Sequence, residues 1–401
     1  MKFLFIDLCS RSINPTNSLI LALLRLVADV VCYGPGFVDE ADLKGGIAKF
    51  AERHGPFDFH VMTLISFELR ESEVRFHSRF TYPRYSYEIV KAFAADAAVF
   101  LKQDNVPKIL FLTALDPYAL PEEYARIIAE LNGYVVSWAE GFSKPISELD
   151  LNVFSREKFF ARYKHRGFGR WHDVVTKYGY KFINLSHFVA ETEFIWTSLD
   201  NRENKAVVPG MMYVRREAAR RKLAERRILA RTGKFGFLMS VMDHAGLRPY
   251  SRPLLQLLYN QTFVKKIGSV RYAYTEGSGF DYPIRKYFEI AAFGTILLCT
   301  PCAGFENLGF VDRMNAIVVD PDAIGDAVEW LQSSPARAQE IASAGRNLIW
   351  NRHSLHARGE QFARCLKSIA AGRFLGSGWD NGEFVVDEGL RAFGSTTGGN
   401  N

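Results

Sequence analysis

Four charged side chains with regular spacing form the strongest candidate for chemistry in this sequence. Asp281, Arg285 and Glu289 are spaced four residues apart, and Lys286 follows Arg285. In a helix capped by Asp281, this spacing places the three on one face with Lys286 beside them. Two cations near a helix start could neutralise a diphosphate, and a carboxylate further along could accept two ribose hydroxyls. A surface helix with i, i+4 ion pairs of about 0.2–0.5 kcal/mol each has the same pattern.

The neighbouring segments would place these side chains at the edge of a sheet. An apolar run ends at Tyr274, and a loop containing Gly277 and Ser278 follows it. A helix is then expected over Pro283–Phe293, and a buried strand over Thr295–Cys299. Open α/β sheets bind ligands beyond the carboxyl ends of their strands, where this loop would lie.

The rest of the chain alternates short apolar runs with amphipathic stretches, which predicts a doubly wound α/β fold. In the first half we expect strands at Lys2–Asp7, Asp29–Tyr33, Phe59–Leu64, Lys108–Thr113, Gly133–Ser137 and Lys181–Leu185, with helices at Ser18–Val27, Asp42–His54, Tyr87–Leu101 and Glu122–Leu131. In the second half we expect further strands at Val207–Gly210, Phe235–Met239, Val270–Tyr274 and Ala316–Val319, and helices at Arg252–Asn260, Ala323–Leu331, Arg337–Ile349 and Leu355–Ile369.

The length of 401 residues is too great for one ordinary core and predicts two domains. We place a first Rossmann-like domain at residues 1–206 and a second at 207–370. Residues 371–401 are rich in Gly, Ser, Asn and Asp, and we expect a partly disordered tail there, most clearly over Gly394–Asn401.

A dense basic stretch from Arg215 to Arg231 begins the second domain. Such a stretch usually forms a solvated linker helix. It would also suit an anionic membrane surface or a phosphorylated acceptor. The net charge of +6 is too mild to indicate a nucleic-acid partner, and the stretch lacks the interleaved aromatic residues of a nucleic-acid site.

Several other protein classes fit the sequence poorly. No Gly-x-Gly-x-x-Gly follows the first strand and no P-loop is present, which argues against nicotinamide dehydrogenases and P-loop ATPases. The N-terminus does not read as a signal peptide, and no apolar run reaches the roughly 20 residues of a membrane helix. Five scattered cysteines, including Cys299 and Cys302, favour a reduced, cytoplasmic setting in which that pair is simply two small residues at a strand end.

The segment around residue 285 resembles the donor-binding helix of GT-B glycosyltransferases, and most closely that of the spore-maturation (CgeB-type) glycosyltransferase-like family. Retaining GT-B enzymes carry two acidic residues separated by seven, followed by Ala-x-Gly and a β-branched strand; here these would be Asp281, Glu289 and Ala292-Phe293-Gly294. Further similar features are Arg285-Lys286-x-Phe288-Glu289, Gly309-Phe310, Asn315–Val319, Ala344-Gly345-Arg346, His353-Ser354 and Arg358. In the first half and at the boundary, Tyr33–Gly36, Asn184–Ser186 and Val207–Gly210 are similar in weaker form.

This resemblance implies two Rossmann-like domains facing across a cleft, and transfer of a sugar from a UDP- or GDP-sugar to a hydroxyl of a glycan, glycolipid or protein. It favours retention of configuration over inversion, and it implies no bound cofactor or metal and a role in bacterial polysaccharide biosynthesis, in the cytoplasm or at the inner membrane face. The implied donor site contains Glu289 on the ribose, Arg285 and Lys286 on the diphosphate, and Asp281, Gly277, Ser278, Arg252 and Ser240 around them.

A catalytic group should come from the first domain or from the cleft. Asp116 and His187 each follow an expected strand and are our candidates, although both residue types also serve in capping and structural roles. A second class stays open, in which a GT-B-shaped protein without catalysis acts as a binding or assembly factor.

Overall fold

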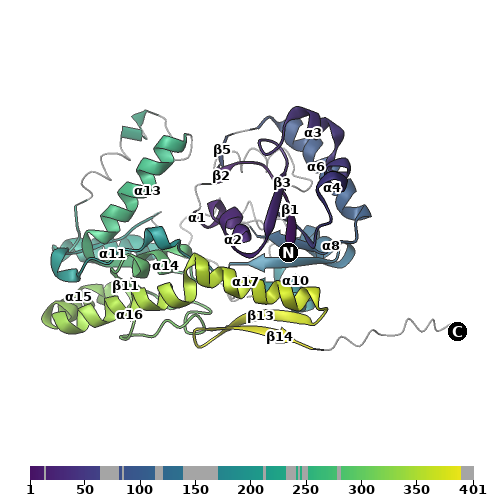
Figure 1. Ribbon diagram of the computed structural model, residues 1–401. Helices are drawn as coiled ribbons and strands as arrows, with labels where there is room; N and C mark the ends of the chain where they lie inside the picture. The colour runs from purple at the N-terminus through teal and green to yellow at the C-terminus, as the bar shows by residue number, and fades with distance from the viewer. Residues whose placement is uncertain are drawn as a thin grey trace.

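The computed structural model describes residues 1–12, 15–63, 81–83, 85–112, 121–138, 170–210, 214–231, 241–242, 244–245, 252–277 and 281–389. It is an α/β protein whose two larger sheets are flanked by helices, and the helical layers of the two halves lie in separate parts of Figure 1.

The first half builds most of an eight-stranded sheet with the order β14-β13-β8-β7-β6-β4-β1-β3. Its parallel strands are β1 (Lys2–Ile6), β3 (Asp29–Tyr33), β4 (Phe59–Thr63), β6 (Lys108–Phe111), β7 (Gly133–Ser137) and β8 (Phe182–Asn184). These strands confirm the expected ones to within two residues. Most of their residues are buried, as in a parallel sheet covered on both faces.

The helices of this half are α1 (Pro15–Ser18), α2 (Ile20–Val27), α3 (Glu40–Gly45), α4 (Ile47–His54), α6 (Tyr87–Gln103), α8 (Pro121–Glu130) and α10 (Arg170–Tyr178). A minor two-stranded sheet joins β2 (Arg11–Ser12) to β5 (Thr81–Tyr82). The single helix expected over Asp42–His54 is wrong, because Gly46 divides it into α3 and α4. The φ of Gly46 is +82°, a left-handed conformation that ends one helix and starts the next.

The second half forms a four-stranded parallel sheet with the order β12-β11-β10-β9. Its strands are β9 (Glu203–Val207), β10 (Val270–Thr275), β11 (Ile296–Cys299) and β12 (Ile317–Val318). The helices are α11 (Val214–Glu225), α13 (Pro253–Gly268), α14 (Arg285–Ala292), α15 (Ile324–Ser333), α16 (Pro335–His353) and α17 (Leu355–Ala370). The expected strand Phe235–Met239 lies outside the described residues.

The C-terminal residues expected to form a tail instead build a β-hairpin of β13 (Phe374–Asp380) and β14 (Glu383–Glu388). Strand β13 joins β8 through Ser377 and Ile183, so the last strands return to the first sheet. Trp379 and Phe384 are buried there. Glycine is depleted in strands, so the sequence of this segment did not indicate a hairpin, and pairing with β8 stabilises the one that forms. Residues Gly394–Asn401 lie outside the described part.

Two further contacts among the described residues also tie the halves together. Helix α17 packs against α2, and a Cβ on Gly359 would lie 3.2 Å from Leu26 Cδ1. The segment between β8 and β9 also passes between the halves, where Phe188 belongs to one hydrophobic cluster with Phe5 of β1 and Phe288 of α14. The segment 185–194 is therefore called the crossover.

Candidate functional site

Helix α14 begins at Arg285, later than the sequence predicted. Its N-cap is Ile284, which is extended, and Asp281 precedes the helix with a φ of +55°. Asp281 therefore does not share a helical face with Arg285 and Glu289, and it does not cap α14. Its Oδ1 instead accepts from the backbone N–H of Ala303 at 3.4 Å. Asp281 lies two residues before Pro283, and its carboxylate stabilises the loop there rather than the helix.

Arg285 is a buried residue whose guanidinium is committed to other protein groups. Its Nε donates to Glu289 at 2.8 Å, and its Nη2 donates to both carboxylate oxygens of Glu193 at 2.7 Å. The remaining nitrogen donates to the carbonyl of Phe188. Burial lowers the pKa of Arg285, but the two carboxylates more than offset this and raise it. The predicted contact with a diphosphate would require this network to open.

Glu289 is also buried, at 6% exposure. Its Oε1 accepts from Arg285, and within the described residues its Oε2 has no hydrogen-bond partner. Helix α14 is buried on its polar side as well as its apolar side because the crossover covers it. The sequence showed an amphipathic helix but not that a distant segment would pack on its charged face.

Lys286 differs from its neighbour because no hydrogen bond or ion pair to it occurs within the described part of the chain. It is partly buried, beside the turn that follows β9. A Cβ on Gly210, whose φ is +97°, would lie 2.6 Å from Lys286 Cε and 3.2 Å from its Nζ. Burial lowers the pKa of Lys286, Glu289 raises it, and Arg216 and Arg285 lower it further. Lys286 is therefore a cation held near carboxyl strand ends with its amino group available.

Arg216 lies close enough to Lys286 to lower its pKa, and it was not among the site residues predicted from the sequence. It lies on α11 at 2% exposure, forms an ion pair with Glu276 at 3.7 Å, and donates to Thr275 Oγ1 at 3.3 Å. In the sequence it stands among many arginines that read as a solvated helix. Its one distinguishing signal is its place in the first turn of the helix that follows Gly210.

The other predicted donor residues are less closely grouped. Gly277 follows β10, and a Cβ there would lie 2.8 Å from the Cβ of Cys302, so close packing requires glycine. Arg252 is the exposed N-cap of α13. Ser278, Ser240 and Asp116 lie outside the described residues.

His187 lies on the crossover directly after β8, at 5% exposure. Its Nδ1 is 3.1 Å from Thr16 Oγ1, and its ring stacks on Trp138 with centroids 6.3 Å apart. Burial, followed by the charges of Arg285, Arg358 and Lys286, lowers its pKa to about 3. The imidazole is consequently neutral at physiological pH and too weakly basic to act as a strong general base.

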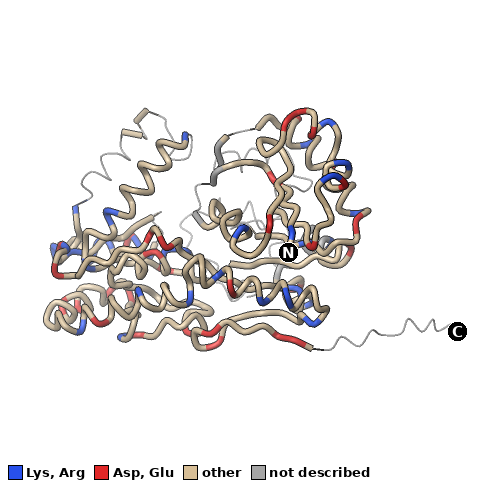
Figure 2. The backbone as a smooth tube through the Cα atoms, in the orientation of Figure 1, with Lys and Arg blue, Asp and Glu red and all other residues tan. Residues whose placement is uncertain are grey.

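The basic stretch Arg215–Arg231 is not a uniformly solvated helix. Figure 2 shows basic and acidic segments together around α11 and α15, where Arg226 forms ion pairs with Asp326 at 2.6 Å and with Glu329 at 2.5 Å. The helix ends at Glu225, so the last arginines of the stretch follow it in an irregular segment.

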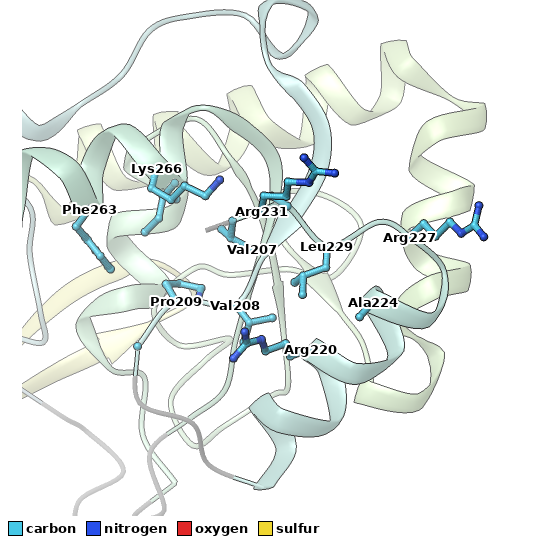
Figure 3. A pocket seen from close by; sticks show the side chains of 13 residues that line it. Val207, Val208, Pro209, Arg220, Ala224, Arg227, Leu229, Arg231, Phe263 and Lys266 are labelled. Atoms are coloured by element: carbon cyan, nitrogen blue, oxygen red, sulfur yellow. The ribbon is translucent and has the colours of Figure 1, made fainter. Parts of the chain in front are cut away.

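A pocket of about 680 Å³ lies between this segment, the end of β9 and α13 (Figure 3). Apolar residues such as Val207, Leu229 and Phe263 line it together with the cations Arg220, Arg227, Arg231 and Lys266. No carboxylate occurs among its described lining residues. The pocket therefore suits a ligand that carries both apolar and anionic groups.

Among the described residues no three His, Cys, Asp or Glu side chains are grouped as metal ligands would be. None of their helices is long and apolar enough to cross a membrane.

Known proteins are similar to this chain in two ways, in the sequence of part of its second half and in the fold of the chain as a whole. The model of a family described as glycosyl transferase-like matches residues 250–364, which contain α13 to α17 except the end of α17. A search of the curated proteins finds no match.

Among solved structures, sucrose-phosphate synthase from Thermosynechococcus elongatus is similar with a TM-score of 0.50 at 11% identity, over 93% of this chain and 100% of that chain. Anabaena HepE in complex with UDP and glucose gives 0.48 at 12% identity, over 92% and 100% of the two chains. A glycosyltransferase from Rickettsia africae gives 0.49 at 11% identity, over 92% and 98%. The chain has the GT-B fold, which confirms the predicted fold class.

Proposed function

We propose that the protein is a glycosyltransferase that moves a sugar from a UDP- or GDP-sugar to a hydroxyl acceptor. The observation that carries this proposal is the match of residues 250–364 to a glycosyl transferase-like family, because this segment contains Lys286 and Glu289 in a GT-B fold. At these positions the structure leaves an amino group and a carboxylate oxygen without protein partners among the described residues.

Glu289 is proposed to accept the ribose hydroxyls. One of its oxygens is held by Arg285, which fixes the orientation of the carboxylate, and the other is available to a ligand. A hydroxyl group that donates to a carboxylate forms a charge-assisted hydrogen bond, which is stronger than a neutral one. This role agrees with the resemblance to the second acidic residue of retaining GT-B enzymes.

Lys286 is proposed to neutralise the diphosphate. Breaking the bond between sugar and phosphate leaves negative charge on the leaving group, and a fixed cation stabilises that charge as it develops. Arg285 is better placed as a positioning residue, because its charge is already balanced by Glu193 and Glu289. This revises the role that the sequence suggested for Arg285.

The remaining parts of the proposal rest on the resemblance. They are retention of configuration, with Asp281 near the donor sugar, and a glycan, glycolipid or protein acceptor in bacterial polysaccharide biosynthesis. Contact with an anionic membrane surface is supported by the four cations of the pocket in Figure 3, which would attract phosphate headgroups.

The donor site can be tested by thermal shift with UDP, GDP, ADP, CMP and dTDP and their sugar conjugates. A nucleotide at about 100 times its dissociation constant stabilises a protein by about 2.7 kcal/mol. We expect one nucleotide to stabilise the wild type, and Glu289→Gln and Lys286→Met to lose most of that stabilisation. Each variant is compared with its own unliganded melting temperature, because both substitutions alter a buried region. Lys367→Met, at an exposed position of α17, is the matched control.

Three results distinguish the alternatives. Equal stabilisation of the wild type and both variants would place the nucleotide elsewhere and refute the donor site. Nucleotide binding without sugar transfer to any acceptor would favour the binding or assembly factor. For an active enzyme, the NMR coupling constant of the anomeric proton in the product reports retention or inversion.

A further inference from the structure

Helix α13 exposes a large part of its apolar surface. Of its 16 residues only Ile267 is buried, whereas Leu254, Leu257 and Leu258 are 65%, 52% and 41% exposed. These positions lie three and four residues apart, so the three side chains share one face of the helix, which we call the leucine face. Figure 1 shows α13 rising away from the other helices of the second half. A continuous apolar face of this kind on a protein surface marks a site of interaction.

The charges of α13 favour an anionic partner. The helix contains no Asp or Glu, its N-cap is Arg252, and Lys265 and Lys266 lie in its last turn. Figure 2 likewise shows basic segments but no acidic segment along this helix. Two copies of α13 packed on each other would bring these like charges together, which is unfavourable. An anionic surface matches the cations of α13 and leaves its leucine face available for apolar contact.

The pocket shown in Figure 3 adjoins the C-terminal end of the same helix. Phe263, Lys266 and Ile267 of α13 form part of its lining. No hydrogen bond or ion pair to the charged groups of its four cations occurs within the described residues; these cations are Arg220, Arg227, Arg231 and Lys266. In Figure 3 Arg227 extends outward, and the other three keep their charged groups near the apolar lining. The pocket thus carries positive charge without a counter-charge.

Other arginines of the second half are neutralised by carboxylates. Arg226 forms ion pairs with Asp326 and Glu329, and Arg337 forms one with Glu340. Arg226 and the arginines of the pocket belong to the same basic stretch, so the lack of a counter-charge is not shared by every arginine there. Cations that lie without counter-charge beside an apolar surface attract the phosphate groups of anionic lipids.

We propose that the leucine face and the pocket together dock on an anionic lipid bilayer. Leu254, Leu257 and Leu258 enter the apolar layer, and the cations of the pocket hold lipid phosphate groups at its surface. The cations alone would give only electrostatic attraction, and α13 adds an apolar anchor beside them. This inference rests on the proposed function and specifies the class of its acceptor.

The docking surface borders the proposed donor site at two points. Gly210 lines the pocket, and a Cβ there would lie 3.2 Å from Lys286 Nζ. Tyr259 of α13 lies near Glu289, because burial raises the pKa of Tyr259 and the charge of the Glu289 carboxylate raises it further. Docking on a bilayer therefore holds the donor at the membrane surface, where a glycolipid is the acceptor within reach. A glycolipid is thus selected from the three acceptor classes of the proposed function.

A soluble anion explains less of this surface. Inorganic phosphate would satisfy the cations of the pocket, but it would leave the leucine face exposed and the apolar lining of Val207, Leu229 and Phe263 unused. An anionic phospholipid carries phosphate and hydrocarbon in one molecule. In the binding of interfacial helices, burial of apolar surface and attraction to anionic lipids add together. A bilayer is therefore the occupant that corresponds to both the pocket and the leucine face.

The test is flotation of the full chain with vesicles of phosphatidylcholine alone or of phosphatidylcholine mixed with phosphatidylglycerol. We expect binding to the mixed vesicles that weakens as salt is added, and much weaker binding to phosphatidylcholine alone. Arg220→Gln with Arg231→Gln should weaken binding to the mixed vesicles about 25-fold, at about fivefold for each cation. Leu254→Ser with Leu257→Ser should weaken it about tenfold or more.

Matched controls make the same chemical changes elsewhere. Arg226→Gln with Arg337→Gln removes two positive charges from exposed, ion-paired positions, and Val99→Ser removes an exposed apolar side chain from α6. Both controls should bind the mixed vesicles almost as well as the wild type. The four positions changed in the docking variants are all exposed, so these variants should fold, which circular dichroism checks.

Several results would overturn the proposal. They are no binding to the mixed vesicles, equal loss in the control variants, or loss in the arginine variant with none in the leucine variant, which would leave electrostatic attraction without docking of α13. Without vesicle binding, thermal stabilisation by inorganic phosphate would identify a soluble anion as the occupant. Self-association that the leucine variant abolishes would, in the same case, identify a second copy of the chain.

The nucleotide-induced thermal shift, measured on the same variants, reports separately on the donor site. Vesicle binding without any nucleotide shift contradicts the proposed function, and with it the glycolipid acceptor, but leaves the docking surface in place. A nucleotide shift without vesicle binding contradicts the docking surface alone.

Discussion

Replacing Arg285 by methionine tests whether this residue is a positioning group or a free ligand-binding cation. Its side chain is 7% exposed and lies against Glu193 and Glu289, whose side chains are 22% and 8% exposed. The substitution would leave two carboxylates close together without their shared cation. Removing one partner of a buried ion pair typically costs about 3–5 kcal/mol.

This cost corresponds to a measurable change in melting temperature. The unfolding entropy of globular proteins is about 2.1 cal/mol/K per residue, so for a chain of this length that unfolds in one transition, about 4 kcal/mol lowers the melting temperature by roughly 5 °C. Thermal unfolding followed by circular dichroism would show the change. The triple variant Glu193→Gln, Arg285→Met, Glu289→Gln removes the charges together and should recover a large part of the loss, since no carboxylate is then left uncompensated.

A different result would refute this reasoning. If Arg285→Met unfolds like the wild type but loses the nucleotide-induced shift, the guanidinium serves the ligand and the earlier interpretation as a diphosphate contact is right. If the triple variant is no more stable than Arg285→Met, repulsion between the carboxylates is not the cause of the loss. The packing of the arginine stem would then be the main contribution.

Two more outcomes follow from the structure. Burial lowers the pKa values of His60 and His187 in the folded protein to about 4 and about 3. As the pH falls below about 6.5, the unfolded chain therefore binds protons that the folded protein does not bind, and the free energy of unfolding decreases. In urea unfolding between pH 6 and 4.5, His60→Gln should reduce that loss by up to about 1.4 kcal/mol per pH unit; equal slopes for the wild type and His60→Gln would contradict the burial effect. Gly210→Ala places a Cβ 2.6 Å from Lys286 Cε at a φ of +97°, so we expect about 1–3 kcal/mol of destabilisation and a smaller nucleotide-induced shift, and an unchanged melting curve would show that Lys286 does not occupy this position.

The local pattern of the sequence was sufficient for most elements. The strands β3 and β7 begin and end at the predicted residues because runs such as Asp29–Tyr33 are apolar, β-branched and bounded by turn residues. The alternation of these runs with helices likewise predicted two α/β halves, and the resemblance around Glu289 predicted the GT-B fold.

Other features depended on contacts between distant residues. Glycine-rich residues after Ala371 became a hairpin because β8 offers an unpaired edge. Arg216 looked like one of many surface arginines until β10 placed Glu276 beside it.

The sequence by itself determined most strands and helices of the two halves and which residues of α14 carry charge, because helical spacing and apolar periodicity are local properties. Only the tertiary structure decided the partner of each charge. Arg285 and Lys286 are adjacent in the sequence, yet the crossover supplies a carboxylate from Glu193 to the first and the Gly210 turn leaves space beside the second. In a partly buried environment, the strongest interaction of a charged side chain is with the charged or polar group nearest to it, and the tertiary structure alone determines which group that is.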